Sequence, residues 1–413
     1  MNNILAIIKN KNVLWNMIGI TINSFFSLFL IILITRFNGV EASGQFSFVF
    51  YLSATFQQIG LFGGRIYQVS DLSNKYKSGS YIALKYFSSF LMIIISFSFC
   101  IINAYDIQKF TLFMIFMIYH IFECISEAFY GILQKHNRLD IIGKSMTYRI
   151  IISLVLFIFL NIITKNIIIA SLAFIVGYAF VLYFYDTKKS KQYESVKMCF
   201  DSRVIKLMKA SYKVCLFTFF NILMLNVTRY AVDINLNDEA QGYFSILIMP
   251  AALIALFAQF LVQPLVTPLS NKYHEHHFVN FAKDTSVVLI IILTFGVAAS
   301  VCSYYILPTL LEIVYSLDFS NYKLEIALVI FAGICSSSTT VISTILIIMR
   351  KMNAQLISFG VSIGFNFLIS FMLVKDSITN AIYCYFTGLL IQLLIFLFVY
   401  IYYIIKDIKK TKI

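Results

Sequence analysis

The sequence predicts an all-α, polytopic membrane protein of about twelve transmembrane helices in two pseudo-symmetric six-helix lobes. Of its 413 residues, 60% are hydrophobic and 12% are charged, with a mean hydropathy of +0.86, whereas a soluble domain carries about 25% charged residues. Apolar runs recur over the whole length, each near the roughly 20 residues that cross about 30 Å of hydrocarbon as a helix. The runs Ile93–Ile102 and Ile391–Ile405 are apolar on every face, which favours helices over the alternating strands of a barrel. A water-soluble fold is excluded.

The longest polar segment, Asp186–Lys213, lies at the midpoint of the predicted spans and is rich in lysine. It divides the chain into an N-terminal six-helix lobe over residues 1–186, a basic cytoplasmic linker over 187–210 and a C-terminal six-helix lobe over 211–413. The predicted spans are 13–35, 43–66, 81–103, 110–134, 144–163, 166–186, 211–231, 241–265, 284–308, 322–349, 354–375 and 378–405.

The positive charges predict the orientation of these spans. Twelve spans place both termini on one side, and nearly all of the 32 lysines and arginines lie on that side. The six exceptions are Arg36, Lys109, Lys165, Arg229, Lys323 and Lys375. Because basic loops stay in the cytoplasm, both termini are expected there. The net charge of +13 is therefore a topology signal beside anionic lipid and not evidence of nucleic-acid binding.

Two pairs of short segments suggest an internal duplication. Thr35–Phe37 matches Thr228–Tyr230, and Glu41–Ser47 matches Glu239–Ser245 with five identities in seven positions. Both pairs fall where the first outer connection of each half is expected, although the second half is five residues longer between them. Repeats with an even number of spans are parallel, and such repeats are typical of alternating-access transporters with a site between the two halves.

Several stretches resemble the polysaccharide-exporter branch of the multidrug/oligosaccharidyl-lipid/polysaccharide (MOP) flippase superfamily, most closely the Wzx-type O-antigen flippases. The resemblance covers the full length, and its most characteristic part is the exit of the fourth span. The stretches are Asn16–Gly44, Phe62–Arg65, Phe129–Lys135, Asn226–Asp233 and Gly242–Ser245.

This resemblance implies a transporter, not an enzyme, that works without a cofactor in the bacterial inner membrane. The implied substrate is an undecaprenyl-pyrophosphate-linked oligosaccharide, an O-antigen or related repeat unit for lipopolysaccharide biosynthesis, moved from the cytoplasmic to the periplasmic leaflet by alternating access. The implied partners are membrane lipid, a coupling ion, H⁺ or Na⁺, and the polymerase and chain-length proteins of the same pathway.

Arginine is the residue best suited to guide a pyrophosphate through a membrane, because its planar fork pairs with phosphate and stays charged. Arg36 and Arg229 are equivalent in the repeat, and Tyr230 follows the second of them. Arg65 and Arg149 lie at inner helix ends. We expect these five residues to line a cavity for pyrophosphate and sugar. The alternative is that the arginines only anchor helices at the interface.

The deepest ionisable residues are Glu123, Glu127 and His120 in the fourth span, whose spacing places them on one helix face. A buried carboxyl without a partner becomes neutral, so this group is a candidate for binding and releasing the coupling ion. The alternative is a structural ion pair between one of these carboxylates and Arg149.

Two other functions remain open for the sequence. A cation-coupled drug antiporter of the same superfamily would share the fold but should have an acidic and apolar cavity. An O-antigen polymerase would need a substantial outer loop, whereas the longest outer connection expected here is Thr309–Asn321. The sequence contains no Walker-type loop and no cysteine or histidine spacing of a familiar metal site.

Overall fold

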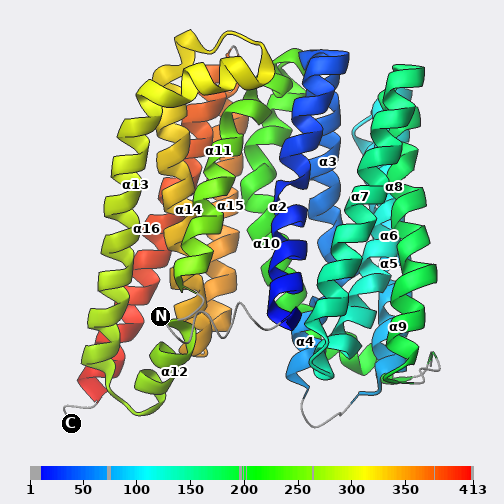
Figure 1. Ribbon diagram of the computed structural model, residues 1–413. Helices are drawn as coiled ribbons and strands as arrows, with labels where there is room; N and C mark the ends of the chain where they lie inside the picture. The colour runs from blue at the N-terminus through cyan, green and yellow to red at the C-terminus, as the bar shows by residue number, and fades with distance from the viewer. Residues whose placement is uncertain are drawn as a thin grey trace. The chain divides into compact units, whose positions relative to one another are not determined.

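The chain is helical throughout the part that the computed structural model describes, residues 11–71, 76–194, 198, 200, 202–262, 265–375 and 377–410, where no strand occurs. It divides into two compact units, and the division falls between Phe219 and Phe220. Figure 1 shows that the long helices of each unit run nearly parallel or antiparallel to one another.

The first unit is built from helices that pass back and forth in chain order. They are α2 (Lys11–Asn38), α3 (Val40–Leu61), α4 (Gly64–Ser70), α5 (Ser78–Ile102), α6 (Ile107–Lys135), α7 (Leu139–Thr164), α8 (Ile167–Val181), the π-helical segment η1 (Leu182–Asp186), α9 (Thr187–Lys191) and the first half of α10 (Ser202–Asn235).

The second unit takes the remainder of α10 and the helices that follow it. They are α11 (Asp238–Val262), α12 (Val266–His274), α13 (Phe278–Tyr315), the 3₁₀ turn η3 (Ser320–Tyr322), α14 (Lys323–Ile348), α15 (Met352–Leu373) and α16 (Ile378–Lys410).

Ten helices among the described residues are long and apolar enough to cross a membrane. Two further long helices, α3 with 22 residues and α11 with 25, occupy the second and eighth predicted spans. Because each of the twelve predicted spans coincides with a long helix, the predicted fold class of an all-α, multi-pass membrane protein is confirmed.

The first unit packs through glycine contacts and an aromatic core. A Cβ atom added to Gly143 in α7 would lie 1.9 Å from the carbonyl oxygen of Trp15 in α2, so the two backbones approach closely. Farther along, the ring of Phe174 in α8 stacks on Phe116 and Phe157, with centroids 5.7 and 5.4 Å away. Phe46 of α3 meets Phe116 edge to face at 5.3 Å. Four helices are thus joined through aromatic side chains.

The second unit is organised around α14. In the most apolar stretch of this helix, 72% of the residues are buried. A Cβ atom added to Gly333 would lie 2.9 Å from the Cα of Ala251 in α11. The Ile334 side chain occupies the space beside Gly296 of α13. Small residues at these points let α11 and α13 pack directly on α14.

The predicted end of the second span is wrong. The second span was expected to continue to residue 66, but α3 ends at Leu61, because Phe62 and Gly63 take left-handed conformations with φ of 38° and 82°. The carbonyl groups released at this break are satisfied from α5: Lys85 Nζ donates to Leu61 O, and Ser88 Oγ donates to Gly60 O at 2.6 Å. The break therefore draws a lysine into the interior.

The predicted outer connection Thr309–Asn321 is also wrong in extent. Helix α13 continues through Pro308 to Tyr315 and ends at Ser316, which has a φ of 58°. Membrane helices tolerate proline where neighbouring groups satisfy the freed backbone. The remaining connection before η3 is only Ser316–Phe319.

Candidate functional site

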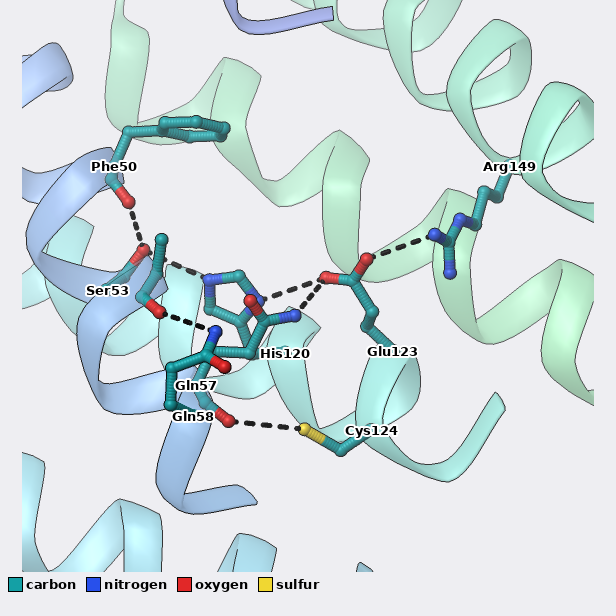
Figure 2. A network of polar contacts seen from close by, with 9 residues as sticks. Phe50, Ser53, Gln57, Gln58, His120, Glu123, Cys124 and Arg149 are labelled. Carbon is teal, nitrogen blue, oxygen red and sulfur yellow. Dashed lines mark hydrogen bonds and ion pairs between the residues drawn. The ribbon is translucent and has the colours of Figure 1, made fainter. Parts of the chain in front are cut away.

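A polar network centred on Glu123 lies inside the apolar first unit. The Glu123 carboxylate accepts a hydrogen bond of 3.0 Å from Arg149 Nη2 at Oε1. At Oε2 it accepts one of 2.6 Å from Gln57 Nε2 and faces His120 Nδ1 at 3.2 Å. Figure 2 shows these side chains converging from α3, α6 and α7. We call Ser53, Gln57, His120, Glu123 and Arg149 the Glu123 network.

The second nitrogen of His120 connects the network to α3. His120 Nε2 lies 3.1 Å from Ser53 Oγ, and the same hydroxyl donates to Phe50 O at 2.7 Å. While the Ser53 hydroxyl donates its proton to Phe50 O, it can only accept from His120 Nε2. Because Nδ1 must donate to the Glu123 carboxylate, both ring nitrogens then carry protons and His120 is an imidazolium. If the hydroxyl turns toward Nε2, the imidazole is neutral. The two patterns differ by one proton on His120.

Only one guanidinium nitrogen of Arg149, Nη2, donates a hydrogen bond to Glu123. The residue is 2% exposed, and its guanidinium carbon lies 4.8 Å from the ring centroid of Tyr178 and 5.7 Å from that of Tyr130. Its Nε and Nη1 atoms have no hydrogen-bond partner in the described part of the chain. The cation is therefore stabilised by one carboxylate and two aromatic faces, with two donors left unused.

The second predicted acid, Glu127, lies one turn farther along α6 and has a looser partner. Arg65 Nε lies 3.8 Å from Glu127 Oε2, and the Arg65 guanidinium lies 6.0 Å from the ring of Tyr130. Arg65 reaches this position because α4 begins directly after the break at the end of α3. The structure thus brings together five of the six residues predicted within the first unit, all except Arg36: Arg65, His120, Glu123, Glu127 and Arg149.

The two arginines that are equivalent in the repeat lie in different environments. Arg36 lies in the last turn of α2 and is exposed. Arg229 is 6% exposed and donates from Nη1 to Ser245 Oγ at 2.8 Å. The five extra residues of the second half lengthen α10 to Asn235, so Arg229 lies well inside its helix.

Tyr230 was predicted to contact substrate together with Arg229. Its half-buried ring packs in an aromatic cluster of the second unit, with centroids 5.8 Å from Phe371 and 6.3 Å from Phe367. Phe367 and Phe371 are themselves stacked at 4.8 Å. Through these contacts the ring of Tyr230 packs α10 against α15.

Two buried charged residues were missed by the sequence analysis. Lys85 is 2% exposed and Asp186 is 0% exposed. Both were assigned to the polar end of a span, Lys85 as one of the cytoplasmic cations and Asp186 as the last residue of the sixth span, where the long polar segment begins. The signal that could have found them is helical spacing: Lys85 lies four residues after Tyr81, and Asp186 four residues after Leu182, on the buried faces of their helices.

The chain is similar in sequence to a capsular polysaccharide biosynthesis protein, CapF, of Staphylococcus aureus. The two are 22% identical over 353 residues, which cover 84% of this chain and 87% of the relative. The sequence matches no protein-family model.

Solved structures of transporters share the fold. An inward-facing multidrug resistance MATE family transporter of the MOP superfamily gives a TM-score of 0.70 at 9% identity and covers 95% of this chain and 99% of that one. The lipid II flippase MurJ in an inward closed conformation gives 0.67 at 15% identity, covering 93% and 87%. These likenesses show that the chain has the fold of the MATE family transporter and of the lipid II flippase MurJ, in agreement with the resemblance found in the sequence.

Proposed function

We propose that this protein moves a lipid-linked saccharide across the cytoplasmic membrane of a bacterium by alternating access, without making or breaking a covalent bond. The observation that carries the proposal is the similarity to the capsular polysaccharide biosynthesis protein over 84% of the chain, on a fold that a lipid II flippase shares. The substrate would be an undecaprenyl-pyrophosphate-linked O-antigen or related repeat unit, delivered to the periplasmic leaflet, with both termini in the cytoplasm.

The buried Arg149 and the half-buried Arg65 support an anionic substrate. A charge at the centre of a bilayer costs several kcal/mol, so a protein retains buried arginines where they have a task. Arg149 keeps two unused N–H donors and Arg65 keeps one, Nη1, among the described residues. Such donors suit phosphate oxygens. Arg36 is exposed at the end of α2, on the expected outer side, where a headgroup would contact it on reaching the periplasmic leaflet.

A cation-coupled drug antiporter is the second candidate, because the MATE family transporter gives the higher TM-score of 0.70. The paired acids and arginines of the first unit argue against it, since a cationic drug gains from unpaired carboxylates. A polymerase is disfavoured further, because the connection Ser316–Phe319 is too short to carry a catalytic site.

The test uses purified full-length protein in liposomes that contain a fluorescent undecaprenyl-pyrophosphate-linked trisaccharide. A membrane-impermeant reductant then bleaches the outer leaflet, and the fraction protected is measured over time. We expect the protein to raise the exchange between leaflets at least tenfold above protein-free liposomes. Equal exchange in both would overturn the proposal, and ethidium transport without saccharide exchange would favour the antiporter.

The coupling ion would be H⁺ or Na⁺, and the acids of the first unit are the candidates to bind it. Glu123 accepts hydrogen bonds from Arg149 and Gln57 and is well stabilised as a carboxylate, which fits the structural alternative for this residue. His120 differs by one proton between two hydrogen-bond patterns, and Glu127 has only the 3.8 Å contact with Arg65. A proton site among these helices is therefore better sought beside Glu123 than on it.

A further inference from the structure

Asp186 is a buried acid that neither the Glu123 network nor the proposed substrate contacts use. It is 0% exposed, within a helical run that is long and apolar enough to span a membrane. Ser126 Oγ of α6 donates to its Oδ2 at 2.9 Å. Its Oδ1 has no hydrogen-bond donor among the residues that the structure describes. The hydroxyls of Ser126 and Ser145 both interact with Asp186, and neutral hydroxyls are weak compensation for a carboxylate removed from water.

The backbone holds Asp186 inward through a π-helical segment. Asp186 is the last residue of η1, where i→i+5 hydrogen bonds replace those of an α-helix. The wider turn reduces the rotation per residue, so positions four apart stay on one face. Tyr178, Leu182, Asp186 and Ser190 are accordingly buried, while Tyr183 is exposed. Such π segments are rare and frequently occur at functional sites.

The ionisable groups around Asp186 come from three elements: Glu127 and Tyr130 from α6, Arg149 from α7, and Tyr185 from η1 itself. The Arg149 hydrogen bond goes to Glu123, not to Asp186.

The remaining groups near Asp186 also have partners elsewhere. Glu127 is 3.8 Å from Arg65, and the hydroxyls of Tyr130 and Ser145 are 2.7 Å from each other. Asp186 therefore forms no ion pair in the described part of the chain.

A buried carboxyl without a cation is more stable as the neutral acid. Arg149 can stabilise the charged form of Asp186 instead, because its Nε and Nη1 donors are unused and Asp186 Oδ1 lacks a donor. We propose that Asp186 is a proton-binding site, which holds its proton while Arg149 pairs with Glu123 and releases it when Arg149 turns its free donors to the Asp186 carboxylate. The ligand is a single proton, and this inference rests on the proposed function in naming that proton as the coupling ion.

Asp186 lies close to one end of its membrane span, so a proton can reach it from the water at that end. Lys188, Lys189 and Lys191 follow it immediately, and Lys188 is exposed. Lysines of this kind lie at the headgroup level. Asp186 is thus within one or two helical turns of water at the lysine-rich end of its span, the end that we expect to face the cytoplasm.

Infrared difference spectroscopy of the full-length protein in lipid vesicles tests the site without reference to transport. We expect a carbonyl stretching band of a protonated carboxylic acid at neutral pH in the wild type. Asp186→Asn should remove this band, whereas Asp140→Asn, the matched control, should keep it, because Asp140 pairs with Arg138 and takes no part in the exchange of Arg149 between Glu123 and Asp186. A band of equal intensity in Asp186→Asn, or no such band in the wild type, would overturn the proposal.

A second variant guards against misfolding of Asp186→Asn. Ser126→Ala keeps the acid but removes the hydroxyl that donates to Oδ2, so the band should persist at a higher frequency. An unshifted band would assign the proton to another group. The exchange assay with the fluorescent saccharide lipid adds a functional arm, in which the wild-type rate should depend on pH and the Asp186→Asn rate should not.

The two proposals can fail separately. Loss of the band in Asp186→Asn, without saccharide exchange by the wild type, would retain the proton site and reject the flippase. Saccharide exchange whose pH dependence survives in Asp186→Asn would retain the flippase and reject Asp186 as the coupling site.

Discussion

Arg149 and Glu123 form an ion pair across 3.0 Å between α7 and α6, with side chains only 3% and 14% exposed. The pair joins two neighbouring membrane helices, and Gln57 adds a third helix through its bond of 2.6 Å to the same carboxylate. Buried pairs of this kind are weak evidence of stability by themselves, but the loss of one partner leaves an uncompensated charge. The pair therefore constrains how α6 and α7 can move.

Arg149→Ala should lower the free energy of unfolding by about 3–5 kcal/mol, because Glu123 then remains buried without its cation. The measurement is thermal or denaturant unfolding of the purified protein in detergent. Adding Glu123→Gln to the Arg149→Ala protein should recover a large part of this loss, since the neutral amide no longer needs the cation. A double variant that loses as much as the sum of both single variants would show that the two residues do not interact.

How much of this could be predicted from the sequence depends on what sets each feature. The spans follow from the thickness of the hydrocarbon layer, so hydropathy located all twelve long helices. Helix ends depend on local backbone conformation, and the left-handed Phe62, a bulky residue in an unusual conformation, has no pattern that predicts it. The ninth span was predicted to end at residue 308, yet α13 continues through Pro308 to Tyr315.

Side-chain partners between helices were the least predictable part of the site. The spacing of His120, Glu123 and Glu127 gave a common helix face, but the rotation of α6 against α3 and α7 decides which acid meets Arg149. The composition around Asp186 is also misleading, because the lysines after it predict a linker while the helix runs on to Lys191. The spacing of four residues from Leu182 to Asp186 continues the buried face, and this signal was outweighed by the lysines.

The contact between α2 and α7 provides a second prediction. Gly143→Ala should lower the free energy of unfolding by about 1–3 kcal/mol, because the new methyl group would lie 1.9 Å from the Trp15 carbonyl and the backbones must separate. Gly364→Ala is the matched control: that helical glycine has nothing within 4 Å of its added Cβ. The control should be neutral or stabilising by up to about 1 kcal/mol. Equal losses in both variants would rule out close packing as the cause.

The repeat-related arginines provide the third prediction, which separates a role in folding from a role in transport. Arg229→Ala should lower the free energy of unfolding by about 1–3 kcal/mol, because Ser245 loses its 2.8 Å partner inside the second unit. Arg36→Ala should change it by no more than about 0.5 kcal/mol, because Arg36 is exposed.

Transport should respond differently to the same changes. Arg36→Ala should slow leaflet exchange of the saccharide lipid by about tenfold or more, since a charged hydrogen bond to phosphate contributes about 1.5–3 kcal/mol. Lys323→Ala is the control, because this exposed lysine is another of the six cations expected on the outer side. If Arg36→Ala and Lys323→Ala slow the exchange equally, the effect belongs to general surface charge. Exchange at the wild-type rate in Arg36→Ala would remove this arginine from the substrate path and leave only its role in anchoring α2 at the interface.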